Sequence, residues 1–166
     1  MSRVYLLRHA KAVWASPGMK DFDRPLAAEG IEACKALGIA MSVSGYVPAI
    51  VLCSTAKRTR ETLSSLNLSP SYRLIESEKL YTQGAETYLK KIRKIEDADS
   101  VMLVGHNPTM EDLAIGLCGH GDPRLLSGLN HGFPTAGLAV IDFDGPLAKA
   151  KPSKGTLVAF LTGQTG

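Results

Sequence analysis

Apolar positions along the chain form two kinds of pattern. Short runs of Val, Ile and Leu are typical of strands buried in a parallel sheet. We expect such strands over residues 4–7, 50–53, 73–75, 101–104, 138–143 and 156–161. Between these runs, apolar residues recur at helical spacing, which predicts amphipathic helices over residues 26–43, 86–96 and 109–118.

Strands that alternate with helices favour an α/β domain whose mostly parallel sheet is covered on both faces. No internal repeat or linker divides the sequence, so residues 1–166 are predicted to form a single domain. Residues 13–25 and 119–134 are the least regular segments and are rich in Gly, Pro and Asp, so we expect loops there. In an open α/β sheet, loops at the carboxyl ends of the strands build the site.

The composition narrows the class of protein. Hydrophobic residues make up 45% of the chain and charged residues 21%, as in ordinary globular domains. A net charge of +3 and an aromatic content of 6% argue against a nucleic-acid binder, which carries a dense basic stripe with aromatic residues. No apolar run is long enough for a membrane helix, and Cys34, Cys53 and Cys118 fit reduced core residues. We therefore expect a cytoplasmic protein, and a monomer because nothing in the sequence requires a partner copy.

Two of the predicted strands end on a histidine. Arg8 and His9 follow the first strand, and His106 follows the strand over residues 101–104. Asn107 is a favourable N-cap for the next helix, and Pro108 suits its first position. If the two strands are neighbours in the sheet, both imidazoles open into the same crevice.

A third predicted strand leads into a cationic helix start. Lys57, Arg58 and Arg60 follow the strand over residues 50–53, and the amides at a helix N-terminus already favour an anion. Guanidinium groups bind phosphoryl oxygens bidentately, and a neutral imidazole can attack phosphorus. One strand-end histidine is commonly structural, but three strand ends with these residue types together predict phosphoryl transfer. Lys57 and Arg60 are assigned to the exposed face of the short helix.

Four ordered segments carry a resemblance to a known family. The segments are LLRHAKA, DFDRPLAAEG, STAKRTRET and VGHNPTMEDL. In this order they resemble the histidine phosphatase (phosphoglycerate mutase-like) superfamily, and within it the SixA-type phosphohistidine phosphatase branch. The resemblance implies a three-layer α/β/α sandwich with its pocket at the carboxyl ends of the strands. It also implies a phosphorylated substrate, such as a histidine-phosphorylated protein.

The resemblance assigns roles to four residues of the predicted pocket. His9 would be the nucleophile that is transiently phosphorylated. Arg8 and Arg58 would bind the phosphoryl oxygens, and His106 would complete the pocket as a donor to the transferring group.

Arg24 belongs to the DFDRPL segment and matches an arginine that lines the pocket mouth in this branch, where it would bind substrate. An ion pair with Asp21 or Asp23 that orders the loop explains Arg24 equally well. Ala10 stands where many members of the wider superfamily have glycine, as it does in the SixA-type branch.

The general acid of the wider superfamily is missing from its usual positions. Thr82 stands where the mutases carry a glutamate, and Asn107 stands where the acid phosphatases carry an aspartate. An alkoxide leaving group needs a proton, and loss of a positioned acid costs about 10²- to 10⁴-fold in rate. The imidazole of phosphohistidine needs less help, so a phosphoramidate substrate is favoured, unless Glu78, Glu86 or Asp112 supplies the acid from elsewhere.

The sequence leaves three other interpretations open. The first is a phosphatase of a small phosphate ester or sugar phosphate. Residues 119–134 would then close over this ligand. The second is an inactive phosphate-binding module, since fold analogy alone does not establish activity. The third is a metal site at Cys118, His120 and His131, but their spacing matches no usual zinc pattern, so no metal is predicted and the two histidines are expected near the pocket rim. No nucleotide-binding fingerprint is present, so no cofactor is expected.

Overall fold

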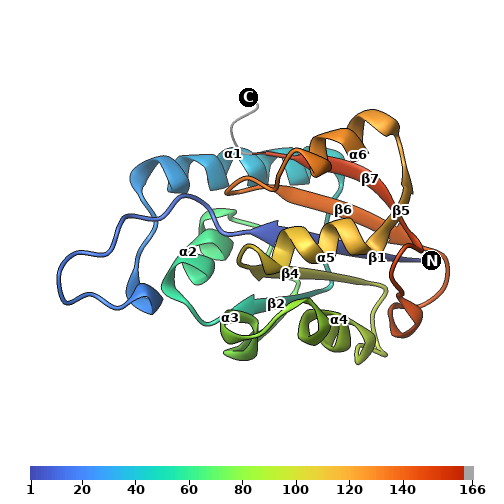
Figure 1. Cartoon of the computed structure of the whole chain (residues 1–166), viewed down its shortest axis with the longest axis horizontal. Coiled ribbons are helices and arrows are strands. Elements are labelled where there is room, and N and C mark those ends of the chain that lie inside the picture. Colours follow the sequence, from blue (N-terminus) through green and yellow to red (C-terminus); the bar gives the residue numbers. More distant parts are fainter. Residues whose placement is uncertain (163–166) are drawn as a thin grey trace.

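A central sheet of seven strands is the core of the computed structural model, which describes residues 1–162 (Figure 1). The strands are β1 (Ser2–Arg8), β2 (Ile50–Ser54), β3 (Arg73–Ser77), β4 (Ser100–Gly105), β5 (Cys118–Gly121), β6 (Leu138–Phe143) and β7 (Gly155–Leu161). They lie in the order β3-β2-β4-β1-β6-β7-β5, and β3, β2, β4 and β1 run parallel to one another. β6 is antiparallel to both neighbours, whereas β5 pairs in parallel with β7. The sheet is therefore mostly parallel, as predicted.

Helices cover both faces of the sheet. They are α1 (Ala28–Ser44), α2 (Lys57–Ser65), α3 (Lys79–Thr82), α4 (Ala85–Arg93), α5 (Thr109–Leu117) and α6 (Pro123–Asn130), with 3₁₀ turns η1 (Asp21–Asp23) and η2 (Leu147–Lys149). The apolar side chains of α1 and α2 pack on one face, and those of α3 to α6 pack on the other. The three-layer α/β/α sandwich is thus confirmed. Over residues 1–162, no helix is both long and apolar enough to cross a membrane.

The alternation of side chains along β1 explains why both faces must be covered. Val4 and Leu6 are fully buried among the helices of one layer, whereas Tyr5 and Leu7 are buried against α1 and α2. Each fully buried side chain of this size stabilises the fold by about 1.5–3 kcal/mol. A strand that is buried on both faces carries its polar residues at its two ends, and Arg8 lies at the end where β1 leaves the sheet.

A glycine allows α1 to lie close to the end of α2. A Cβ atom added at Gly38, which is buried in α1, would collide with the backbone carbonyl of Leu66. The contact is between two backbones, so neither side can move a flexible side chain aside. It fixes α2, and therefore the position of Arg58, relative to the α1 layer.

The segment over residues 119–134 was wrongly predicted to be a loop. It contains the end of β5 and all of α6. The start of α6 does carry a sequence signal, because the Asp122 carboxylate accepts a hydrogen bond from the Arg124 amide at 2.8 Å and Pro123 lies in the first turn. The short strand β5 contains two glycines, a residue that is depleted in strands, so only its pairing with β7 defines it.

The cysteines agree with the prediction. Cys34 and Cys53 are buried and Cys118 is half-buried, and the three thiols are free of disulfides. Burial raises the pKa of the Cys53 thiol to about 12, so it remains protonated at neutral pH.

Candidate active site

The two histidines predicted to share a crevice follow the ends of neighbouring strands. β1 and β4 are adjacent, with Arg8 opposite Gly105. The backbone amide of His9 donates to the Gly105 carbonyl at 3.0 Å, which holds the two strand ends together. As a result the rings of His9 and His106 lie 5.4 Å apart between centroids, inclined at 55°.

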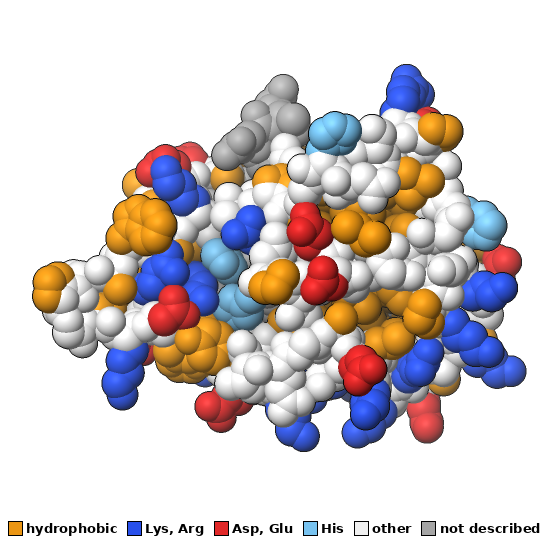
Figure 2. Space-filling view, viewed as in Figure 1, with side chains coloured by type: hydrophobic (Ala, Val, Ile, Leu, Met, Phe, Trp, Pro, Cys, Tyr) orange, Lys and Arg blue, Asp and Glu red, His pale blue; other side chains and the backbone are white. Residues whose placement is uncertain are grey.

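A pocket of about 380 Å³ opens at this edge of the sheet. All five residues predicted for the site line it: Arg8, His9, Arg24, Arg58 and His106. Figure 2 shows Lys or Arg and His side chains gathered around this hollow, with hydrophobic side chains on its flanks. The pocket thus combines two imidazoles with three guanidinium groups drawn from β1, the η1 loop and α2.

The imidazole of His9 is held in one tautomer. Its Nδ1 atom lies 2.7 Å from the Ala10 carbonyl oxygen, and since that oxygen can only accept, Nδ1 carries the proton. The lone pair therefore resides on Nε2. Burial, together with the nearby charges of Arg58 and Arg8, lowers the pKa of His9 to about 4, so the ring is neutral at physiological pH.

His106 is oriented by a serine on the neighbouring strand. Its Nε2 lies 2.8 Å from the Ser54 hydroxyl at the end of β2. Within residues 1–162, its buried Nδ1 atom has no hydrogen-bond partner. Burial and the proximity of His9 and Arg58 lower the pKa of His106 to about 3, so this ring is also neutral.

The two inner arginines are anchored through part of their donor sets. Arg8 donates from Nη1 to the Phe133 carbonyl at 3.0 Å. Arg58, whose side chain is only 8% exposed, donates to the Asp21 carbonyl at 2.8 Å and to the Asp21 carboxylate at 3.0 Å. The buried Nε atoms of Arg8 and Arg58 find no acceptor among the described residues. Each arginine is thus fixed in place, and each keeps a donor that no described residue uses.

Asp21 connects the arginines and was not predicted as a residue of the site. Its carboxylate accepts hydrogen bonds from Arg24 at 3.0 Å, from Arg58 at 3.0 Å and from the Tyr81 hydroxyl at 2.8 Å. Burial of this carboxyl would raise its pKa, but these bonds outweigh burial and hold the pKa at about 2. The ion pair with Asp21 that the sequence offered for Arg24 is therefore present, and Arg24 lines the pocket as well.

Tyr81 is a second residue that sequence reasoning missed. Its ring packs edge-on against His106 at 5.4 Å between centroids, and the Arg58 guanidinium lies 5.8 Å from the ring centre. Burial raises the pKa of Tyr81 first of all, and the bond to Asp21 adds to this effect. Tyr81 directly precedes Thr82, the position of the missing acid, in the LYT segment. This neighbourhood is the signal in the sequence that points to Tyr81.

The candidate acids lie away from the pocket lining. Thr82 is exposed and its hydroxyl donates to the Glu78 backbone carbonyl at 3.4 Å. Glu86 and Asp112 are exposed and line a different hollow beside α4 and α5.

Lys57 and Arg60 are exposed on α2, as predicted, and Arg60 pairs with Glu76 at 2.9 Å.

Asn107, predicted to be the cap of the following helix, lies one position before it, because the cap position is Pro108 and α5 begins at Thr109. Its side chain still accepts from a first-turn amide of α5, that of Glu111, at 3.2 Å. It also donates to the Phe133 carbonyl at 3.0 Å, so it joins two segments. Since Phe133 also accepts from Arg8, the segment after α6 helps to position the pocket.

The remaining two histidines occupy different places. His131 is exposed, donates from Nδ1 to the Ser127 carbonyl at 2.7 Å, and lines a hollow that shares Asn107 with the pocket. His120 is exposed on β5 opposite Thr156 of β7. Over residues 1–162, no group of three or more His, Cys, Asp and Glu side chains is arranged to hold a metal ion.

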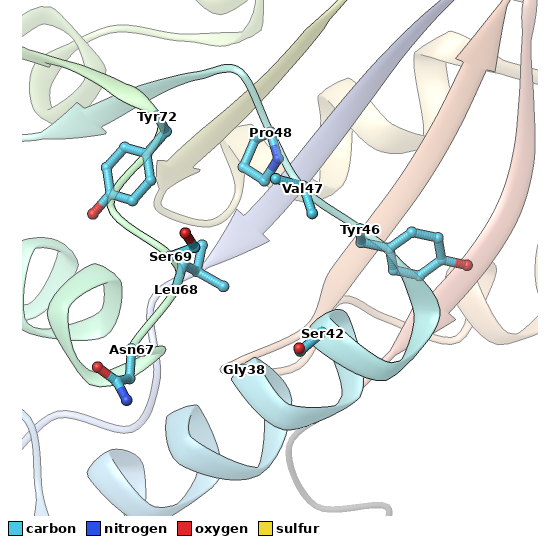
Figure 3. A pocket seen from close by; sticks show the side chains of 9 residues that line it. All are labelled: Gly38, Ser42, Tyr46, Val47, Pro48, Asn67, Leu68, Ser69 and Tyr72. Carbon is cyan, nitrogen blue, oxygen red and sulfur yellow. The ribbon is translucent and has the colours of Figure 1, made fainter.

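A separate pocket lies at the other end of the strands, where β2 and β3 begin (Figure 3). Its lining includes Tyr46, Pro48 and Tyr72, together with serine, asparagine and aliphatic residues. No cationic side chain lines it, so it lacks the groups that would bind a phosphoryl group. The chemistry is therefore concentrated in the pocket of His9 and His106.

A parallel α/β sheet with two neutral imidazoles among arginines at its carboxyl edge is the arrangement of the histidine phosphatases. The model of the histidine phosphatase superfamily (branch 1) matches residues 4–81. An uncharacterised protein of Mycobacterium tuberculosis is 35% identical over 159 residues, which cover 93% of this chain and 98% of the relative.

Similar solved structures indicate the branch of the superfamily. One assigned to the phosphohistidine phosphatase SixA of Agrobacterium tumefaciens is 39% identical, with a TM-score of 0.84 over 96% of this chain and 97% of that chain. A second, assigned to SixA of Nakamurella multipartitia, is 30% identical, with a TM-score of 0.80 over 96% and 95%. A SixA structure with tungstate shares the fold at 20% identity, with a TM-score of 0.76 over 97% of each chain. The chain belongs to the histidine phosphatase superfamily, in its SixA-type branch, and is a phosphatase.

Proposed function

We propose that this protein removes the phosphoryl group from phosphohistidine on a protein substrate, through a phosphorylated His9. Three residues that line one pocket each carry a buried nitrogen without a hydrogen-bond partner among the described residues, and these nitrogens support the proposal most directly. Within residues 1–162, the Nε atoms of Arg8 and Arg58 and the Nδ1 atom of His106 have no protein acceptor. Buried donors without an acceptor are costly, and a phosphoryl group offers several oxygens that would satisfy them together.

The geometry supports a reaction in two displacements. In the first, the Nε2 lone pair of His9 forms a bond to phosphorus while the bond from phosphorus to the imidazole nitrogen of the substrate breaks, and the substrate ring, protonated on its other nitrogen, leaves as neutral imidazole. In the second, water attacks the phosphorylated His9, the Nε2–phosphorus bond breaks, and inorganic phosphate leaves. Arg8 and Arg58 stabilise charge on the equatorial oxygens in both steps, and Nδ1–H of His106 donates to another.

The nature of the leaving group favours phosphohistidine. A nitrogen leaving group that belongs to an imidazole departs with less need of a proton than an alkoxide does. The Tyr81 hydroxyl near His106 is engaged with Asp21. Among residues 1–162, no carboxyl group other than that of the ionised Asp21 is bonded to the pocket arginines. The names of the relatives assigned to SixA agree with this substrate class.

A phosphatase of small esters receives less support. That alternative assigned residues 119–134 to a flap that closes over the ligand, but the segment forms β5 and α6, and α6 packs into the core through Leu129. Arg24 is assigned to substrate binding at the mouth of the pocket. The single domain, monomeric state and cytoplasmic location expected from the sequence stay predictions.

The test compares initial rates on histone H4 phosphorylated on histidine and on para-nitrophenyl phosphate, with wild type and His9→Ala. We expect wild type to favour the phosphohistidine substrate and His9→Ala to lose at least about 10³-fold of its activity, because the nucleophile is absent. His131→Ala, which alters an exposed histidine outside the pocket, is the matched control and should retain activity. Activity that survives in His9→Ala would remove His9 from the mechanism. No activity in wild type and no phosphate trapped on His9 would leave the phosphate-binding module.

A further inference from the structure

The indole of Trp14 stands at the rim of the pocket without cover. Its exposed fraction is 88%, although it belongs to the lining of the pocket that holds His9 and His106. Figure 1 shows the segment after β1 running away from the body of the molecule and returning through η1. Tryptophan is enriched among the residues that anchor protein interfaces.

The base of this segment is tied down. The Val13 amide donates to the Pro25 carbonyl at 2.9 Å, and Ala12 forms an antiparallel bridge with Leu26. Arg24 donates from Nε to the Val13 carbonyl at 2.8 Å, directly before the tryptophan. Trp14 is therefore presented at a fixed place next to the pocket.

Trp14 also touches the charged lining of the pocket. The Arg24 guanidinium lies 5.7 Å from the centre of the indole ring, within the range of a cation–π contact. Arg24 itself is held by Val13 and Asp21, so its position does not depend on the indole. The apolar surface at the rim is thus continuous with the cations that face the phosphoryl group.

We propose that Trp14 is the docking residue for the polypeptide that carries the phosphohistidine, a conclusion that rests on the proposed function. His9 lines the pocket and is only partly exposed, and a phosphohistidine side chain is short. The substrate backbone must therefore come down onto the rim before phosphorus can reach Nε2 of His9. The residues beside the phosphohistidine then cover the indole, while the charge complementarity of the phosphoryl group with Arg8, Arg24 and Arg58 fixes the occupant as a phosphorylated protein.

The first experiment separates docking from chemistry by substrate size. Rates are measured for wild type, Trp14→Ala and Trp14→Phe on histidine-phosphorylated histone H4 and on free phosphohistidine. We expect Trp14→Ala to raise KM for the histone about five- to tenfold, the range of a moderate interface anchor, with less than about twofold change for free phosphohistidine. Trp14→Phe should recover most of the loss, because an aromatic ring remains at the rim.

The second experiment uses the fact that Trp14 is the only tryptophan in the sequence. Phosphorylated histone H4 is titrated into His9→Ala, which binds without turnover, and tryptophan emission is recorded. Cover of the indole should shift the emission to shorter wavelength. Free phosphohistidine, which does not reach over the rim, should shift it much less.

A matched control keeps the inference open to refutation. Val43→Ala removes another exposed apolar side chain, 83% exposed at the end of α1 and outside the pocket lining, and should not change KM for either substrate. Equal KM changes for histone and free phosphohistidine in Trp14→Ala would overturn the docking role, since the indole would then act on the pocket itself. A concentration-dependent dimer in wild type that Trp14→Ala abolishes would also overturn it, because a second copy would be the occupant.

If wild type cleaves neither phosphohistidine substrate, the proposed function fails. The emission titration then still decides whether a phosphorylated protein covers Trp14. The two failures are therefore distinguishable.

Discussion

The hydroxyl of Ser54 lies 2.8 Å from Nε2 of His106. The same hydroxyl oxygen accepts from the Ala56 amide at 3.3 Å, and its own proton can be donated to His106. If Ser54 donates to Nε2, then Nδ1 of His106 must carry the ring proton. That is the buried atom without a hydrogen-bond partner among the described residues, so we expect donation from Ser54 to select the tautomer in which Nδ1 of His106 is a donor.

Ser54→Ala should therefore impair the reaction without removing any group that touches the substrate. We expect kcat to fall about 10- to 30-fold, the value of one well-placed hydrogen bond in the transition state. Imidazole ¹⁵N shifts of His106 should change from a single tautomer to a mixture. Ser2→Ala is the matched control, because the buried Ser2 hydroxyl has no partner within residues 1–162 and lies at the far end of β1. An unchanged tautomer in Ser54→Ala would contradict the positioning role.

Replacement of Asp21 by asparagine should separate binding from catalysis. Asp21→Asn removes a negative charge that is bonded to Arg24 and Arg58, so inorganic phosphate should inhibit several-fold more strongly. The arginines also lose a partner that orients them, so kcat should fall about tenfold. Asp23→Asn, an exposed aspartate in the same turn, should change neither quantity. Weaker inhibition by phosphate in Asp21→Asn would show that orientation outweighs charge.

The stability of the protein should decrease in mild acid because of its two pocket histidines. Their pKa values are about 4 and about 3 in the folded state, whereas an unfolded histidine has a pKa of about 6.5. Below a pH of about 6.5 the two histidines bind protons in the unfolded chain but stay neutral in the folded protein. Protonation therefore favours the unfolded state, and the free energy of unfolding decreases as the pH falls toward 4. Urea unfolding at pH 7.5 and pH 5 should show this loss, and His106→Asn should reduce it. Bound tungstate, an anion that favours imidazolium, should raise both pKa values in an NMR titration, and a histidine that titrates near 6.5 in the free protein would contradict the picture.

The close approach of α1 to α2 predicts an asymmetric response to alanine. Gly38→Ala should lower the free energy of unfolding by about 1–3 kcal/mol, the usual cost of overpacking, because its Cβ meets the Leu66 carbonyl. Gly116→Ala places the same atom in open space on α5 and should raise stability by about 0.5–1 kcal/mol. Both values are measured by urea denaturation. Equal effects in the two variants would show that the contact at Gly38 relaxes freely.

The sequence by itself determined every strand except β5, and the type of chemistry. Apolar runs such as the one before Arg8 have to be buried, and this local requirement holds whatever the rest of the chain does. The motif residues at the ends of these runs were therefore found without a structure. The start of α6 was also encoded, at Asp122 and Pro123, but the glycines around it obscured the pattern.

Only the tertiary structure decided which strand ends meet. The hydrogen bonds of Asp21 to Arg58 and Tyr81 join residues 37 and 60 positions apart, and that of Ser54 to His106 spans 52 positions. Such contacts depend on the strand order that places β4 between β1 and β2, and periodicity along a chain carries no information about order across a sheet. The pocket is assembled by packing between layers, so its supporting residues became visible only in the folded chain.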